Sequence, residues 1–438
     1  MTNSELLHLL RCEVIPAIGC TEPIAVALCT ARAKELLGAE PDKITVYLSK
    51  NVYKNALAVG IPNTGMTGLP IAIALGATVG KSEYMLEVLR DATPESVAYA
   101  KDYMLRVPAQ IHINYEAPSI LYIHAEVRKG EQMAQATIMD EHTHFVTSPI
   151  SLSDASNSGV PEQSADCWGA NSPQSLNLRR VYDFAIEVDT SELSFLLEGA
   201  QMNTAAAETS FAEQYGHGLG RLLRLRNIHS TLQGGDGGGL PLFGDTLFTK
   251  IISYTCGACD ARMSGAMVQV MSNSGSGNQG ISCSIPVYLY AKENNCSEEQ
   301  TLRALALSNL TVIYIKQSLG RLSALCGCVV AATGSAAGIT YLMGGNYEEI
   351  TYAIKNMIAN ISGMICDGAK PGCALKVTSG VATAIFSAYL AMQHSYADST
   401  EGIVEDDIDR TIRNLTRIGH DGMKVTDDLI LDIMTHKK

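Results

Sequence analysis

The feature that most constrains the fold is a change of hydrophobic pattern partway along the chain. Between residues 110 and 146 the sequence has four short runs rich in branched and aromatic residues, separated by turn signals such as Ala117-Pro118 and Lys129-Gly130. Consecutive strands with such short links favour an antiparallel sheet. After Leu178 the apolar residues recur with helical spacing almost to the end. We therefore predict an α+β fold, in which an N-terminal α/β region with a small antiparallel sheet precedes a large all-helical region.

The boundary between the two regions falls in residues 148–176, which are rich in Ser, Pro, Asn and Gly and are typical of a linker or lid. We predict an α+β domain over residues 1–175, beginning with helices, and an all-helical domain over residues 176–438. The length of 438 residues agrees with a prior of about two or three domains.

Two stretches, residues 322–347 and 377–397, contain no Lys, Arg, Asp or Glu, and either is long enough to span a bilayer. The first is rich in Gly, Ser, Thr and Cys, and neither has a basic cluster on one flank that would set an orientation. A helix buried on all sides in a large helical domain has the same composition. We therefore expect core helices and no membrane partner.

The net charge of the chain indicates which partners it can bind, and the N-terminal residues indicate its cellular compartment. The chain has 32 basic and 45 acidic residues, a net charge of -13, and no block of five like charges. Nothing concentrates positive potential on one face, so we expect no nucleic-acid partner. Residues 1–16 lack a basic segment followed by an apolar one, so we expect no signal peptide and a cytoplasmic location. Disulfides are then not expected, and the 12 cysteines should be thiols or metal ligands.

Three cysteines have a spacing that suits a metal centre. Cys366 and Cys373 flank a loop with Gly and Pro, and Cys326 lies 40 residues before Cys366. Three thiolates turned toward one centre suit an iron–sulfur cluster or zinc, and packing as small apolar residues is the alternative. Cys256 and Cys259 form a CxxC pair, but no second pair follows at zinc-site spacing, so we expect both to pack in a helix. We expect the same of Cys12, Cys29, Cys167, Cys283, Cys296 and Cys328.

A loop rich in Gly and Ser precedes an apolar run that begins at Ile281. Its backbone N–H groups, next to a helix N-terminus, can bind a carboxylate or phosphate. The Lys-Ser/Thr of a P-loop is absent. Arg262, just upstream, can supply a guanidinium fork, and a tight turn between helices is the alternative. The predicted substrate-binding residues are Arg262, Ser272, Asn273, Ser274, Gly275 and Asn278.

Two smaller polar clusters occur in apolar surroundings. One contains Asn51, Lys54 and Asn55, and the other contains His142 and His144. Two histidines at i and i+2 in a strand share one face, so a metal pair is conceivable, although a structural histidine is the commoner case.

Six motifs match one family together: GCTEP at 19–23, PNTGMTGLP at 62–70, DARMSGA at 260–266, MSNSGSGNQGI at 271–281, LSALC at 322–326 and GMICDGAKPGCALK at 363–376. They resemble the L-cysteine desulfidase family, a group of serine dehydratase alpha-like proteins that is distantly similar to the iron–sulfur L-serine dehydratases. The resemblance runs from about residue 5 to residue 435.

The resemblance implies an oxygen-sensitive 4Fe-4S cluster and no pyridoxal phosphate. The family's cysteines fall on Cys20, Cys326, Cys366 and Cys373, of which the last three would hold the cluster. Related serine dehydratases have a C-terminal cysteine on the open iron until substrate displaces it. This chain ends in MTHKK, so Cys20 would either take that place or act as an acid/base.

The implied reaction is β-elimination of L-cysteine to pyruvate, ammonia and sulfide. Three thiolates would leave the fourth iron as a Lewis acid for the carboxylate and the departing sulfur. The loop with Arg262 would hold the carboxylate, and Cys20, Lys54 or His142 would handle protons. L-Serine dehydration is one alternative, and a non-catalytic amino-acid sensor built on the α+β domain is another. Symmetry base rates favour a homodimer.

Overall fold

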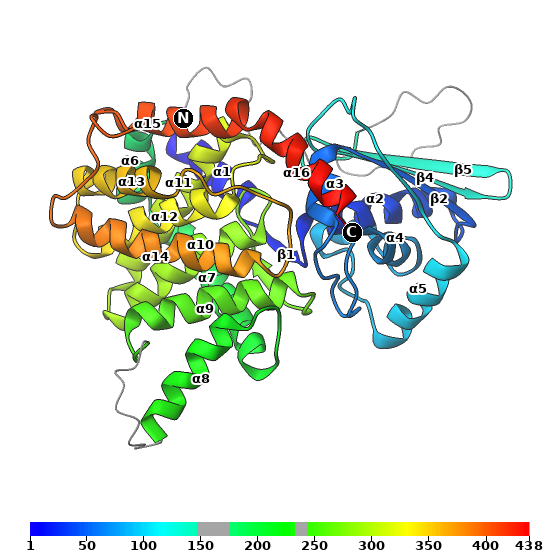
Figure 1. Ribbon diagram of the computed structural model, residues 1–438, viewed down its shortest axis with the longest axis horizontal. Coiled ribbons are helices and arrows are strands. Elements are labelled where there is room, and N and C mark those ends of the chain that lie inside the picture. The colour runs from blue at the N-terminus through cyan, green and yellow to red at the C-terminus, as the bar shows by residue number, and fades with distance from the viewer. Residues whose placement is uncertain (147–175, 233–242, 438) are drawn as a thin grey trace. The chain divides into compact units, whose positions relative to one another are not determined.

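The computed structural model describes residues 1–146, 176–232 and 243–437, which group into two compact units (Figure 1). The helical unit comprises Met1–Thr21, Lys54–Gly68 and Leu176–Lys438, and the sheet unit comprises Glu22–Tyr53 and Leu69–Ser175. The chain is 61% helical with a small sheet near the N-terminus, which confirms the α+β fold class. A domain boundary after residue 175 stays a prediction. The predicted linker (apart from residue 176) and Cys167 lie outside the described residues.

The sheet unit contains four strands in the spatial order β3-β2-β4-β5, with bounds β2 (Lys43–Leu48), β3 (Gln110–Ile113), β4 (Tyr122–Lys129) and β5 (Gln132–Met139). β2 pairs with β4 and β4 with β5 in antiparallel registers, as the short links predict. β3 differs, because it joins β2 in parallel with Thr45 opposite Gln110. A parallel pair needs a long crossover, and the chain between these strands includes α3 (Lys50–Ala56), α4 (Leu69–Thr78), η1 (Ser82–Glu87) and α5 (Pro94–Arg106).

Helix α2 (Thr21–Leu37) lies on the sheet, where the Cys29 thiol donates to the Ala136 carbonyl of β5 at 3.2 Å. α4 packs closely on α2, because a Cβ built on Gly76 would lie 2.4 Å from the carbonyl oxygen of Ala27. Cys29 therefore packs as expected in a buried α2–sheet interface.

The helical unit has a two-stranded ribbon and a large set of packed helices. β1 (Pro16–Ile18) pairs antiparallel with β6 (Gln269–Met271), with Pro16 opposite Met271. The other elements are α1 (Asn3–Glu13), α6 (Leu178–Glu187), η2 (Thr190–Leu193), α7 (Ser194–Ala212), α8 (Leu219–Leu232), α9 (Leu247–Met263), α10 (Gly277–Glu293), α11 (Glu298–Leu319), α12 (Gly327–Leu342), α13 (Tyr347–Ile361), α14 (Cys373–Ala391), α15 (Ile408–Arg417), η3 (Ile418–Gly422) and α16 (Lys424–His436).

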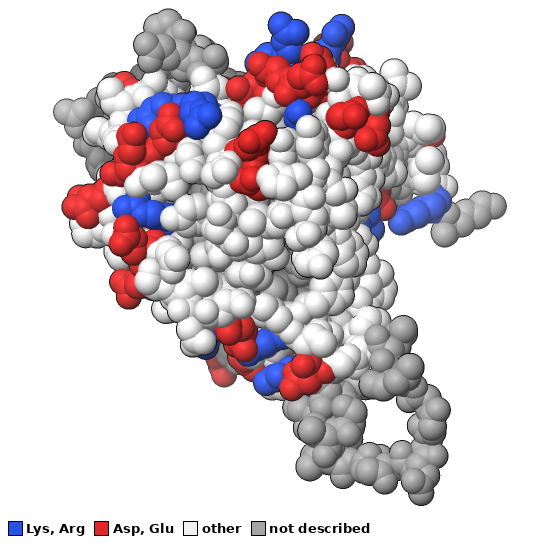
Figure 2. Space-filling model, turned by 90° about the vertical axis from the view of Figure 1, so that its left-hand side faces the viewer, with Lys and Arg blue, Asp and Glu red and all other residues white. Residues whose placement is uncertain are grey.

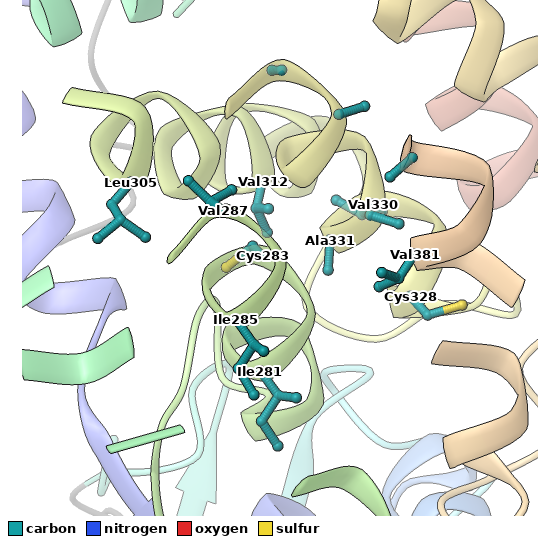
Figure 3. Packing of buried hydrophobic residues seen from close by; sticks show 14 of the residues in the cluster. Ile281, Cys283, Ile285, Val287, Leu305, Val312, Cys328, Val330, Ala331 and Val381 are labelled. Atoms are coloured by element: carbon teal, nitrogen blue, oxygen red, sulfur yellow. The ribbon is translucent and has the colours of Figure 1, made fainter. Parts of the chain in front are cut away.

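Helix α12 forms the centre of the helical unit, packed against α10, α11, α13 and α14. Every residue from Cys328 to Thr340 is buried, so the first uncharged stretch is the core helix that its composition predicts. Figure 3 labels Val330 and Ala331 of α12 and Ile285 and Val287 of α10, which belong to the same buried cluster.

Within the described residues, α14 is the one helix long and apolar enough to cross a membrane by length and composition. It packs against α9, α12 and α13, and a core helix of this kind passes the same test. On the face drawn in Figure 2, Lys and Arg side chains stand beside Asp and Glu side chains around a broad uncharged area.

Candidate functional site

A short antiparallel contact brings Cys326 and Cys366 together. Leu325 and Ile365 face each other in an isolated bridge. The amides of Cys326 and Cys366 each donate across this bridge, at 2.9 and 2.6 Å. Since side chains alternate between the two faces of paired strands, the two cysteines project from the same face.

Cys373 completes the group. Cys326 immediately precedes α12, and Cys373 is the first residue of α14. Burial raises the pKa of the Cys373 thiol to about 11, and negative charge on Cys326 and Cys366 adds to the increase. The three thiols are thus near enough to repel one another when ionised. Two of them lie at helix N-termini, where the N–H groups and the helix dipole favour a thiolate.

Cys328 adjoins the same group, although the sequence indicated only a packing role. Its thiol donates to Cys326, and this hydrogen bond is the main cause that lowers the pKa of Cys326, to about 7. The same bond, together with burial, raises the pKa of Cys328. The Cys328 sulfur also lies 3.1 Å from the sulfur of Met364. Figure 3 shows its side chain beside Val381 of α14.

Two lysines bring positive charge to the loop between Cys366 and Cys373. Lys370 and Lys376 both form ion pairs with Asp367. Burial opposes ionisation of Asp367, but hydrogen bonds from the two lysines hold the pKa of this carboxyl at about 2. The Lys376 ammonium also donates to the Ile365 carbonyl at 2.8 Å. The loop therefore has a net positive charge of one from these three side chains, which favours thiolates and other anions.

Lys54 reaches the cysteine loop from a distant part of the sequence. It is buried, and its ammonium donates to the Cys366 carbonyl at 3.3 Å. It also forms an ion pair with Asp427 of α16. Lys54, a predicted proton-handling residue, therefore contacts the backbone of Cys366, a predicted cluster ligand.

The side chains of the polar loop after β6 mostly stabilise the loop itself. The Ser272 hydroxyl donates to the Ile15 carbonyl at 2.7 Å. The Asn273 amide donates to Asn309 Oδ1 at 2.9 Å, and the Ser274 hydroxyl donates to Asn273 Oδ1 at 2.8 Å. These three side chains are buried, so they hold the shape of the turn that leads into α10.

Arg262 lies at the end of α9 and contacts the start of α10. Its guanidinium is 1% exposed, and Nη1 donates to Asn278 Oδ1 at 2.9 Å. A Cβ built on Gly277 would lie 2.3 Å from Nε, so only glycine fits beneath the guanidinium. The left-handed φ of 75° at Gly275 turns the chain into α10. Arg262 is therefore in contact with Asn278 and Gly277 at the start of α10.

This arginine site and the cysteine group are contiguous. A Cβ built on Gly327, the residue after Cys326, would lie 3.3 Å from the side chain of Gln279 on the first turn of α10. Cys259 is close enough to feel both Arg262 and Cys373. Burial raises the pKa of Cys259, negative charge on Cys373 raises it further, and the charge on Arg262 opposes the increase. The N-termini of α10, α12 and α14 thus border one region of the helical unit.

Cys20 and His142 are the other two residues predicted to handle protons. Cys20 is buried just after β1, and the β1–β6 register puts it at the opposite end of this ribbon from Ser272. His142 belongs to the sheet unit, where it is buried in the turn after β5. Cys256 and Cys259 are fully buried in α9, and none of the described cysteines forms a disulfide.

His217 and Asp260 are not among the site residues predicted from the sequence. His217 lies between two glycines of left-handed φ, Gly216 and Gly218, and its Nε2 would be 3.9 Å from a Cβ on Gly372. Its backbone amide donates to Asp260 at 3.3 Å, and Asp260 is fully buried. The Gly-His-Gly sequence is the signal that could have identified this turn beside the start of α14.

The helical unit thus brings Cys326, Cys366 and Cys373 close to lysines and to the buried Arg262. A family model described as "Serine dehydratase alpha chain" matches residues 83–432. The chain therefore belongs to the serine dehydratase alpha chain family. UPF0597 proteins are similar over their whole length: that of Bacteroides fragilis is 54% identical, covering 100% of both chains. That of Porphyromonas gingivalis is 48% identical over 100% of this chain and 99% of its own. That of Photobacterium profundum is 41% identical over 98% of each.

Proposed function

We propose that this protein is a lyase that β-eliminates L-cysteine to pyruvate, ammonia and sulfide, with a 4Fe-4S cluster held by Cys326, Cys366 and Cys373. The observation that supports this most strongly is the group of three thiols at the starts of α12 and α14. Membership of a dehydratase family supports the class of reaction. We place the reaction in the cytoplasm, because thiolates persist in a reducing compartment.

The donor set fits such a cluster. Thiolates are its usual ligands, and the site adds Lys370, Lys376 and two helix N-termini, which offset negative charge. Among the described residues no three His, Cys, Asp or Glu side chains converge on a point that could hold a single ion. In a cluster each cysteine binds its own iron, so the sulfurs need not converge.

The cluster, when bound, supplies a Lewis acid that stabilises the departing sulfur as it leaves the β-carbon. The chain's own residues then have two tasks. They must hold the amino acid with its Cβ toward the cysteine group, and they must take the α-proton as the C–S bond breaks. Loss of the α-proton and of the sulfur on Cβ gives aminoacrylate and sulfide. Water then converts aminoacrylate to pyruvate and ammonia.

We propose Lys54, Cys20 and His142 as the residues that handle protons in the reaction. Lys54 has the clearest support, since its ammonium lies 3.3 Å from the Cys366 carbonyl. Its ammonium donates to Asp427 and to this carbonyl, and a group that already donates fits delivery of a proton to the leaving group better than removal of one from Cα.

L-Serine is the second candidate substrate, and the family's description favours it. Its elimination releases water in place of sulfide, and a hydroxyl needs stronger activation than a thiolate, which is also the softer ligand for iron.

The test is turnover of the anaerobically purified chain on L-cysteine and on L-serine, with pyruvate and sulfide measured separately. We expect equal amounts of pyruvate and sulfide from L-cysteine, and a lower kcat/KM for pyruvate from L-serine. Cys283→Ser is a matched control, because Cys283 is a fully buried cysteine of α10 and is not one of the three proposed cluster ligands. No pyruvate from either amino acid, with iron present, would refute the proposal; a preference for L-serine would replace its substrate.

A further inference from the structure

Arg262 is a buried cation that has no anionic partner among the residues that the structure describes. It is 1% exposed, and Nη1 donates to Asn278. Nε and Nη2 are buried and have no hydrogen-bond partner among the described residues. These two atoms carry the parallel N–H bonds along one edge of the guanidinium, the edge that binds a carboxylate in a bidentate manner. Burying a charge without a partner is costly, so such a group is retained for what it binds.

The free edge of Arg262 lies against the start of α10. The guanidinium is so close to Gly277 that a Cβ there would be 2.6 Å from Cζ. The first N–H groups of a helix have no intrahelical partner and attract anions. The starts of α10, α12 and α14, which border the cysteine group, have no side-chain cap among the described residues. The starts of α7 and α16 also have none, whereas side chains cap α1, α6, α9, α11, α13 and α15.

The same turn of α10 also offers an acceptor. Gln279 is buried, its Nε2 donates to the Asn273 carbonyl at 3.2 Å, and its Oε1 has no hydrogen-bond partner among the residues that the structure describes. Because the partner of Nε2 is a carbonyl oxygen, the opposite amide atom must be the oxygen, an acceptor. Gln279 lies beside Gly327, next to Cys326. An ammonium bound there would be on the side of the site nearer the cysteines.

We infer that Arg262 and the first turn of α10 bind the carboxylate of an α-amino acid, whose ammonium is accepted by Gln279. The inference rests on the proposed function for the identity of the ligand, and it assigns the carboxylate to a protein cation in place of an iron atom. The amino acid would then point its β-substituent toward the start of α12. Glycine at position 277 is required because any side chain would displace the guanidinium.

The test is calorimetric titration of the full chain with L-alanine, which has no leaving group, and with L-alaninamide, which lacks the carboxylate. Both the anaerobically purified chain and the same chain after iron chelation are titrated. We expect L-alanine to bind both forms, L-alaninamide to bind at least about tenfold more weakly, and Arg262→Met to lose L-alanine binding by a similar factor. Arg262→Lys should recover part of the affinity, because it keeps the charge and loses the fork.

Thermal unfolding separates a binding role from a structural one. Arg262→Met removes a buried charge that has no anionic partner, so its Tm should equal or exceed that of the parent chain. Arg303→Met is the matched control. Arg303 pairs with Glu299 and donates to the Ala185 carbonyl at 3.0 Å, so its loss should lower the Tm and leave L-alanine binding unchanged.

Binding of L-alanine that depends on iron and is unaffected by Arg262→Met would overturn the inference. A large fall in Tm for Arg262→Met, together with lost binding, would also overturn it, since Arg262 would then be structural. Loss of L-alanine binding in Arg262→Met, in a chain that eliminates neither cysteine nor serine, would support the site and refute the proposed reaction.

Discussion

Lys54 and Asp427 form a buried ion pair that joins the C-terminal helix α16 to the cysteine loop. The side chain of Lys54 is 2% exposed and that of Asp427 17%. The same ammonium donates to the Cys366 carbonyl, so a single cation holds two segments that are distant in sequence. α16 also contacts this loop through Met434, whose methyl group would lie 3.1 Å from a Cβ on Gly368. The position of Cys366 thus depends on residues at both ends of the chain.

Replacing Lys54 by Met should destabilise the protein by about 3–5 kcal/mol, because it leaves the Asp427 carboxylate and the Cys366 carbonyl without their shared partner. Urea unfolding measures the change. Arg11→Met is the control, since Arg11 forms an exposed ion pair with Glu192 whose loss should cost about 0–1 kcal/mol. Equal effects of the two substitutions would show that the Lys54 pair does not anchor the loop.

Gly277→Ala should weaken both packing and binding at the start of α10. The added Cβ would lie 2.3 Å from Nε of Arg262, so the guanidinium or the helix must move, at a cost of about 1–3 kcal/mol. Gly363→Ala is a matched control, because a Cβ there meets nothing within 4 Å. Urea unfolding measures the loss of stability, and steady-state kinetics measure the KM for L-cysteine, which should rise. An unchanged KM in Gly277→Ala would show that the position of Arg262 does not affect substrate binding.

Asp260 should make stability depend on pH. Burial raises the pKa of this carboxyl from 3.8 to about 6. Between these values the folded chain holds a proton that the unfolded chain has lost, so stability falls as pH rises through this window. Asp260→Asn keeps an acceptor for the His217 amide and removes the titration. Urea midpoints from about pH 4 to pH 7 should therefore fall more steeply for the parent chain than for the variant, and parallel profiles would contradict the assignment.

Much of the fold can be predicted from local pattern. The uncharged stretch around α12 reads as a core helix because burial on all sides removes any need for charge. The strands β4 and β5 follow from branched residues and a short turn. The parallel partner of β2 could not be predicted in the same way. Alternation of apolar residues in β3 does not specify which strand lies beside it or in which direction, and that pairing depends on the helices of the crossover.

The site, like the fold, is only partly predictable from local sequence patterns. Cys366 and Cys373 are near in sequence, but the place of Cys326 depends on the bridge between Leu325 and Ile365, which no local pattern specifies. Arg262 could be chosen from its position before the polar loop. Its lack of an anionic partner among the described residues depends on the tertiary positions of the acidic side chains. Glu13, whose backbone carbonyl accepts from Ser274 of the polar loop, is paired with Arg321 at 2.6 Å. Lys54 was identifiable as a polar residue in apolar surroundings, and its contact with Cys366 required the tertiary structure.

The central claim is that Cys326, Cys366 and Cys373 hold a 4Fe-4S cluster, and the most direct measurement is iron and acid-labile sulfide per chain after anaerobic purification. The parent chain and Cys259→Ser should each contain about four iron and four sulfide. Cys259 is fully buried in α9, so its replacement leaves the three thiols in place. Cys373→Ser should lose most of the iron together with the brown absorbance. Iron-free protein from the parent chain after anaerobic reconstitution, or an unchanged iron content in Cys373→Ser, would contradict the account.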